Sequence, residues 1–191
     1  MNRDERYSRR MPLNGGCRPV GRTLVELVIA LAIGAALVSL ALPSYHEWIA
    51  RAEQSNAAHA LMQALNVARS EAIRRGQRVD VCASADGVTC SGTGRWADGW
   101  ITFVDLDDSG DRVPGEWQVA VEPAMPPRVS ITGNKPVSRY VSYTDLGHAR
   151  LTSGALQMGT FDVCRSGQTL IQVVLANSGR ARIQQTKTPC P

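Results

Sequence analysis

Residues 21–43 read Gly-Arg-Thr-Leu-Val-Glu-Leu-Val-Ile-Ala-Leu-Ala-Ile-Gly-Ala-Ala-Leu-Val-Ser-Leu-Ala-Leu-Pro, and this stretch decides how the chain is organised. From Thr23 to Leu42 the only polar residues are Thr23, Glu26 and Ser39. About twenty helical residues at ~1.5 Å each match a hydrocarbon core of ~30 Å, so one helix here can span a membrane. Glu26 is the exception, because a charged side chain within such a helix costs roughly 2.5–3.5 kcal/mol at mid-bilayer and normally has a partner.

Charges around this stretch predict its orientation. The next basic residue after it is Arg51, whereas six arginines precede or begin it: Arg3, Arg6, Arg9, Arg10, Arg18 and Arg22. The positive-inside bias therefore predicts a cytoplasmic N-terminus, with the remainder of the chain on the outer side of the membrane. The alternatives are an uncleaved anchor and an ordinary secretory signal ending near Ala41, although Glu26 and the long preceding segment fit a secretory signal poorly.

The run Gly21-Arg22-Thr23-Leu24-Val25-Glu26, followed by an apolar helix, resembles the type III signal of bacterial type IV pilins and pseudopilins. The resemblance implies that a prepilin peptidase cuts after Gly21 and methylates the new N-terminal residue, Arg22. Family members usually have phenylalanine at that position, so Arg22 is a departure. The resemblance also implies that Glu26 pairs with the N-terminal amine of a neighbouring subunit in a filament.

Four segments are predicted along the chain. Residues 1–21 are the leader, residues 22–43 the transmembrane and assembly helix, residues 44–76 an amphipathic helix, and residues 77–191 a β-rich periplasmic head. The part beyond the membrane helix is long enough for one domain with its own core. The leader holds five of the 21 basic residues and two of the 17 acidic ones, so the mature chain carries a net charge of about +1.

The helical segment after the membrane has an apolar stripe. Its members recur at spacings of three and four residues: Ala57, Leu61, Ala64, Leu65, Ala68 and Ala72. This spacing predicts one helical face that packs on the head. Pro43, which lacks an amide hydrogen, is expected to bend or interrupt the helix, and Gly76 is expected to cap its end.

Beyond Gly76 the apolar pattern has a period of two, which predicts β-strands. The predicted strands are residues 78–83, 100–104, 117–121, 128–131, 140–143, 160–164, 169–175 and 179–184. Short strands and frequent turns predict an antiparallel, sandwich-like head packed on the helix, which is an α+β fold. Trp96, Trp100 and Trp117 are expected to pack in the core or in loops.

Residues 65–76, with Val81-Cys82 and Asp98-Gly99-Trp100, resemble the FimT and GspH group of minor pilins and pseudopilins. Together with the signal, the resemblance covers most of residues 21–184. It implies a structural subunit that assembles with other pilins through its N-terminal helix. The filament is either a type IV pilus or the pseudopilus of type II secretion, and the sequence does not separate the two.

Cysteine usage agrees with export. Cys82, Cys90, Cys164 and Cys190 lie in the head, and Cys17 lies in the leader. Four cysteines allow three pairings, of which the sequence-local one, joining Cys82 to Cys90 and Cys164 to Cys190, is favoured. An oxidising periplasm permits such bonds. Zinc binding is the alternative, but neither pair has Cys-x-x-Cys spacing.

Residues 105–116 read Asp-Leu-Asp-Asp-Ser-Gly-Asp-Arg-Val-Pro-Gly-Glu and have the spacing of a calcium-binding EF-hand loop. The candidate ligands are Asp105, Asp107, Ser109, Asp111 and Glu116. Strands rather than helices flank the loop, and an acidic segment of this kind also occurs as an ordinary solvated hairpin turn. Calcium is the one cofactor that the sequence suggests.

The C-terminal end is basic. After Asp162 there is no acidic residue, whereas Arg165, Arg180, Arg182 and Lys187 follow. Alternation along a strand puts Arg180 and Arg182 on one face, where two guanidinium groups can hold phosphate oxygens without reading base sequence. Some FimT-like minor pilins bind DNA through a similar Gly-Arg-x-Arg, which implies DNA as a partner, with Arg165 and Lys187 widening the patch. The alternative is an edge strand that uses arginine to discourage aggregation.

An enzyme is not predicted. His46, His59 and His148 are scattered, and no nucleophile elbow, phosphate loop or His-Glu-x-x-His motif accompanies them. His46 and His59 are expected on helix surfaces. A membrane-anchored hydrolase is the remote alternative to a filament subunit.

Overall fold

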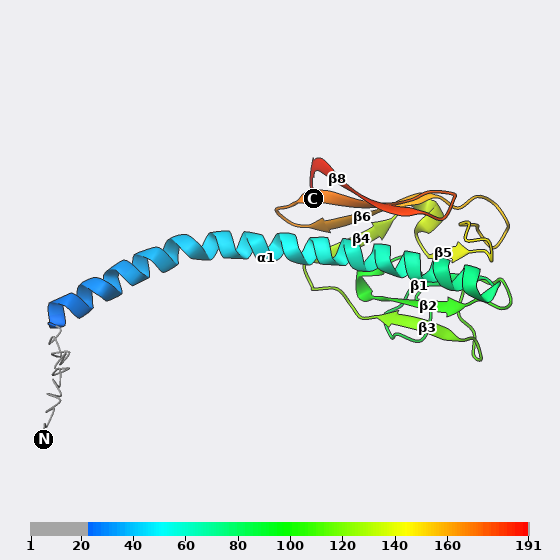
Figure 1. The fold of residues 1–191 in the computed structure, drawn as a ribbon, viewed down its shortest axis with the longest axis horizontal. Helices are drawn as coiled ribbons and strands as arrows, with labels where there is room; N and C mark the ends of the chain where they lie inside the picture. Colours follow the sequence, from blue (N-terminus) through cyan, green and yellow to red (C-terminus); the bar gives the residue numbers. More distant parts are fainter. Residues whose placement is uncertain (1–22, 191) are drawn as a thin grey trace, which may run out of the picture. The chain divides into compact units, whose positions relative to one another are not determined.

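The computed structural model of the chain describes residues 23–190, which Figure 1 shows as a ribbon. The chain divides into two compact units, Met1–Pro43 and Ser44–Pro191. Gly21 and Arg22, where prepilin cleavage is predicted, lie outside the described residues, as does Cys17. The leader and its removal therefore stay predictions.

Described residues of the first unit form the beginning of helix α1, Leu24–Arg75. Thr23 caps this helix, because its hydroxyl oxygen accepts a hydrogen bond of 3.2 Å from the Glu26 backbone N–H. The apolar side chains along this part are exposed, for example Leu24, Leu27 and Leu31. Among the described residues, α1 is the one helix whose length and composition suffice to cross a membrane.

Helix α1 has no break at Pro43, so of the two outcomes expected there, a bend or an interruption, the interruption does not occur. A proline removes one backbone donor, but its fixed φ is compatible with a helix. The helix ends as predicted at Gly76, which has a left-handed φ of +63°. The N–H groups of Gly76 and Gln77 both donate to the carbonyl of Ala72, at 3.0 and 3.3 Å.

The part of α1 in the second unit buries the predicted apolar stripe. The stripe residues that are at most 2% exposed are Ala57, Leu61, Leu65, Ala68 and Ala72. Ala64 is half-buried and packs against them, and Ala58, at 0% exposed, widens the stripe. The 3.6-residue period therefore identified the packing face of this helix correctly.

Eight strands form two antiparallel sheets of four strands each, and Figure 1 shows α1 beside them. The first sheet has the order β3-β2-β1-β5, with β1 Val79–Ala83, β2 Trp100–Val104, β3 Gln118–Glu122 and β5 Tyr140–Tyr143. The second has the order β4-β6-β7-β8, with β4 Val129–Gly133, β6 Gly159–Arg165, β7 Thr169–Leu175 and β8 Ala181–Pro189. Every predicted strand overlaps one of these, and the α+β fold is confirmed.

One apolar core joins the helix to both sheets. Leu61 of α1, Trp100 of β2 and Phe161 of β6 belong to it, and each is at most 1% exposed. Trp96 packs edge-on against Phe161, with ring centroids 5.0 Å apart. Of the two places expected for Trp117, the core and a loop, it takes the loop before β3, where it is 65% exposed and its ring centroid lies 6.0 Å from the Arg75 guanidinium carbon.

Two disulfides tie loops to the sheets. Cys82 bonds to Cys90, and Cys164 bonds to Cys190, which is the pairing that the sequence favoured. The first bond lies on the face of the first sheet that the helix does not cover, in a small cluster with Ile101. The second fixes the end of the chain to β6, because it closes a loop with a sequence separation of 26 residues.

Candidate functional site

The basic tail begins at a tight turn before β8. Gly179 has a φ of +80° and donates its N–H to the carbonyl of Ala176 at 2.9 Å. A Cβ atom at this position would overlap the carbonyl oxygen of Gly147. The glycine of the Gly-Arg-x-Arg sequence is therefore required by the turn and by a close backbone approach.

Arg180 and Arg182 are both exposed, whereas Ala181 and Ile183 are half-buried and pack against the core. The alternation predicted from the sequence is thus present, with both arginines turned away from the core at an edge strand of the second sheet. Within the described part of the chain, neither arginine takes part in a salt bridge. Two free guanidinium groups suit phosphate oxygens.

The other two predicted tail residues differ in their surroundings. Lys187 is exposed on β8. Arg165 is not free, because its guanidinium, 11% exposed, pairs with the carboxylate of Glu53 on α1. Its part in a phosphate-binding surface stays a prediction, and the ion pair argues against it because a paired guanidinium has less charge to offer a phosphate.

The acidic loop between β2 and β3 brings together three of its predicted ligands. One carboxylate oxygen from each of Asp105, Asp107 and Glu116 lies within 4.8 Å of the others. Backbone N–H groups donate hydrogen bonds to the carboxylates of the two buried acids, Asp105 and Glu116. Asp105 accepts from Gly110 at 2.9 Å, and Glu116 accepts from Leu106 at 2.8 Å and from Val113 at 2.9 Å.

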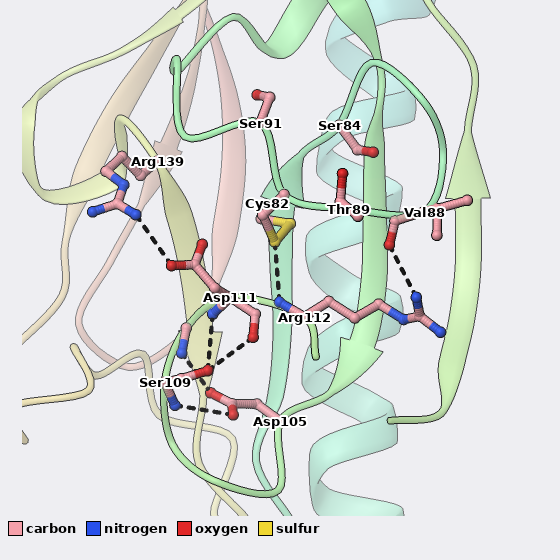
Figure 2. The surroundings of a disulfide bond; sticks show 12 residues. Cys82, Ser84, Val88, Thr89, Ser91, Asp105, Ser109, Asp111, Arg112 and Arg139 are labelled. Atoms are coloured by element: carbon pink, nitrogen blue, oxygen red, sulfur yellow. Dashed lines mark hydrogen bonds and ion pairs between the residues drawn. A yellow bond between two sulfur atoms is a disulfide. The ribbon is translucent and has the colours of Figure 1, made fainter. Parts of the chain in front are cut away.

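Ser109 and Asp111 do not join this cluster, so the five-residue ligand set expected from the EF-hand spacing is not formed. Figure 2 shows the Asp111 carboxylate turned to Arg139, with 3.2 Å between the ion-paired atoms. The Ser109 hydroxyl instead donates to the Asp111 carbonyl at 2.8 Å.

Asp80, on β1, was missed by sequence reasoning. It is 0% exposed, and within residues 23–190 neither of its carboxylate oxygens has a hydrogen-bond partner. Burial raises the pKa of Asp80 well above its usual value, and the adjacent Asp105 carboxyl raises it further. All five residues of β1 are buried, so the alternation that reveals a half-exposed strand gave no sign of this residue.

Glu26 lies in the first turn of α1, where an acid is favoured by the helix dipole. The spacing from Thr23 is that of a capping box. Among the described residues Glu26 has no cationic partner. A cation from a second subunit is consistent with this. His46 and His59 are exposed on α1 as expected, and His148 is exposed in a loop.

A long N-terminal helix packed on antiparallel sheets defines a pilin-like fold, and solved structures of minor pilins share it. The chain is similar to the type IV minor pilin FimU of Pseudomonas aeruginosa PAO1, with 19% identity, a TM-score of 0.56, and coverage of 72% of this chain and 96% of FimU. For a second crystal form of FimU the identity is 18% and the TM-score is 0.53, with coverage of 70% of this chain and 98% of that chain. For the minor pseudopilin EpsH of the Vibrio cholerae type II secretion system the identity is 16% and the TM-score is 0.47, with coverage of 70% of this chain and 97% of that chain.

The chain belongs to the GspH family. The family profile, described as type II transport protein GspH, matches residues 57–179, which is more than half of the chain. Membership gives the chain a structural role as a minor pilin or pseudopilin, with other pilins or pseudopilins as partners. No curated protein matches the sequence.

Proposed function

We propose that the protein is a minor subunit of a type IV pilus. It is made as a prepilin, inserted in the inner membrane with a cytoplasmic N-terminus, and cleaved after Gly21 by a prepilin peptidase. The observation that carries the proposal is the exposed apolar part of α1, joined to a head of the GspH family. Apolar side chains on all sides of a helix need lipid or neighbouring helices around them.

Glu26 sets the register of assembly in this proposal. Its carboxylate pairs with the N-terminal amine of Arg22 in a neighbouring subunit, which removes the cost of a lone charge among apolar helices. The lack of a cation beside Glu26 among the described residues supports this pairing. The head is then carried outward as the filament grows.

A finer part of the proposal concerns DNA. Arg182 and Lys187 are exposed on the edge strand β8, and Arg180 is exposed just before it. Contacts to the phosphate backbone from such a surface are independent of base sequence. Binding of this kind suits a pilus that takes up DNA. The two arginines carry the expectation because each is free of an acidic partner within residues 23–190.

The test is a titration of fluorescent double-stranded DNA with the detergent-solubilised full chain at two salt concentrations. We expect salt-sensitive binding that Arg180→Ala/Arg182→Ala abolishes or weakens, with the salt slope reduced by about two. The matched control is Arg128→Ala/Lys135→Ala, which removes two other exposed basic residues that have no salt bridge within the described residues. Absence of binding, or equal losses in both double variants, would contradict DNA binding by the tail and leave the filament role standing.

The second candidate is a pseudopilin of type II secretion that does not bind DNA. The family description, type II transport protein, favours it. A deletion strain separates the two machines, because loss of a pseudopilin blocks export of secreted proteins, whereas loss of a pilus subunit affects twitching, adhesion or DNA uptake.

A further inference from the structure

Acidic residues of the loop between β2 and β3 fall into two groups. Residues 105–116 contain five acids and one base, Arg112. Asp108 pairs with Arg78, and Asp111 pairs with Arg139. The remaining three acids, Asp105, Asp107 and Glu116, have no basic partner among residues 23–190, and they are the three whose carboxylates converge.

The spacing of the three carboxylates suits a calcium ion. Ligand oxygens bound to Ca²⁺ at about 2.4 Å lie at most about 4.8 Å from one another. The oxygens of Asp105, Asp107 and Glu116 satisfy this limit. Oxygen donors without histidine or cysteine select calcium or magnesium over zinc, and magnesium requires a stricter octahedral shell.

A second observation, separate from the loop, indicates a missing cation. Asp80 lies on β1, fully buried, and neither of its carboxylate oxygens has a hydrogen-bond partner among the described residues. Its carboxyl is adjacent to that of Asp105, one of the three converging acids. Polar groups this deeply buried normally have partners, and charged ones are paired or lie next to a metal.

We propose that Asp105, Asp107 and Glu116 bind a calcium ion, with the buried Asp80 carboxyl next to Asp105. The ion links both ends of the loop, because Asp105 follows β2 directly and only one residue separates Glu116 from the start of β3. It thereby holds the loop against the face of the first sheet that the helix does not cover. This inference is independent of which filament the protein serves.

Backbone conformation, close packing and a contact with the disulfide already fix part of the loop. Asp108 adopts a left-handed φ of +56°, and Gly110 packs so closely on Tyr140 and Thr152 that a Cβ there would lie 3.1 Å from each. Arg112 follows, and its backbone N–H donates to Cys90 Sγ at 3.4 Å (Figure 2). The disulfide and the turn therefore fix the C-terminal half of the loop, whereas Asp107 is exposed and accessible to an ion from solvent.

The experiment is calorimetric titration of calcium chloride into the EDTA-treated, disulfide-bonded full chain in detergent, with magnesium chloride as a parallel titrant. We expect one calcium per chain with a dissociation constant of about 10⁻⁴–10⁻³ M, the range of extracellular calcium modules, and weaker binding of magnesium. Calcium also raises the thermal midpoint of the wild type.

Asp107→Asn is the test variant, since Asp107 is an exposed ligand, and Asp111→Asn is its matched control in the same loop. The proposal predicts an affinity loss of about tenfold or more for Asp107→Asn and near wild-type binding for Asp111→Asn. Circular dichroism in EDTA verifies that both variants are folded. The proposal is overturned by the absence of calcium binding at millimolar concentration, or by equal affinities in the two variants.

Discussion

The guanidinium of Arg165 on β6 pairs with the carboxylate of Glu53 on α1, across 112 residues of sequence. Next to Glu53, the buried Gln54 side chain donates to the carbonyls of Val163 and Thr169, at 2.8 and 2.9 Å. Two successive helical residues therefore attach α1 to the second sheet through polar contacts. Arg165, which the sequence predicted as part of the basic tail, thus helps to hold the helix on the second sheet.

Replacing Arg165 is expected to lower the stability of the fold. Arg165→Ala leaves Glu53 partly buried and unpaired, which should reduce the free energy of unfolding by about 1–3 kcal/mol. Denaturant unfolding of the full chain in detergent measures this loss. Arg128→Ala, an exposed arginine without a salt bridge in the described part of the chain, should change stability by no more than about 0.5 kcal/mol. Equal effects of the two variants would contradict a structural role for Arg165.

Gly179 should tolerate no side chain. Gly179→Ala imposes a left-handed φ on alanine and drives its Cβ into the Gly147 carbonyl, so we expect a loss of about 2–4 kcal/mol. Gly154→Ala is the matched control, because Gly154 has a similar φ of +84° but no atom within 4 Å of the added Cβ. That variant should lose only about 1 kcal/mol. Thermal unfolding compares them, and similar losses would mean that the close approach to Gly147 is unimportant.

Glu71 provides a pH-dependent prediction. Hydrogen bonds from Arg74 and then Arg75 lower the pKa of Glu71 to about 2. Because the folded pKa lies below the unfolded value of about 4.3, the stabilisation is present above pH ~4.3 and is lost as the pH falls toward 2. The pair is near the surface, so its contribution is at most about 1 kcal/mol. Unfolding of the wild type and Glu71→Gln should differ at pH 6 and converge near pH 2, and a constant difference would contradict this origin.

Sequence periodicity was sufficient for the architecture because each element had a clear repeat. The stripe from Ala57 to Ala72 follows the helical period, and all eight strands follow the period of two or form short apolar runs. Helix α1 continues through Pro43 without the interruption that was one of the two outcomes expected of this proline. Trp117 was also outside the reach of pattern reasoning, since its exposure depends on where β3 lies at the sheet edge.

Candidate sites were only partly predictable, since sequence spacing does not fix tertiary contacts. The alternation around Arg180 and Arg182 appears as expected because it is local to one strand. The partners of Arg165 and Asp111 come from other elements, so their ion pairs could not be read from sequence. Asp80 was hidden in a strand that is buried on both faces.

The incorporation of a Glu26 variant into filaments tests the filament role most directly. Glu26→Ala and wild-type protein are expressed in a strain lacking the native copy, and both are quantified in the inner membrane and in sheared filaments, with Ser39→Ala as the control within the same apolar segment. The account predicts that Glu26→Ala reaches the membrane in normal amount but is strongly depleted from filaments, while Ser39→Ala assembles normally. Wild-type incorporation of Glu26→Ala into filaments would contradict it.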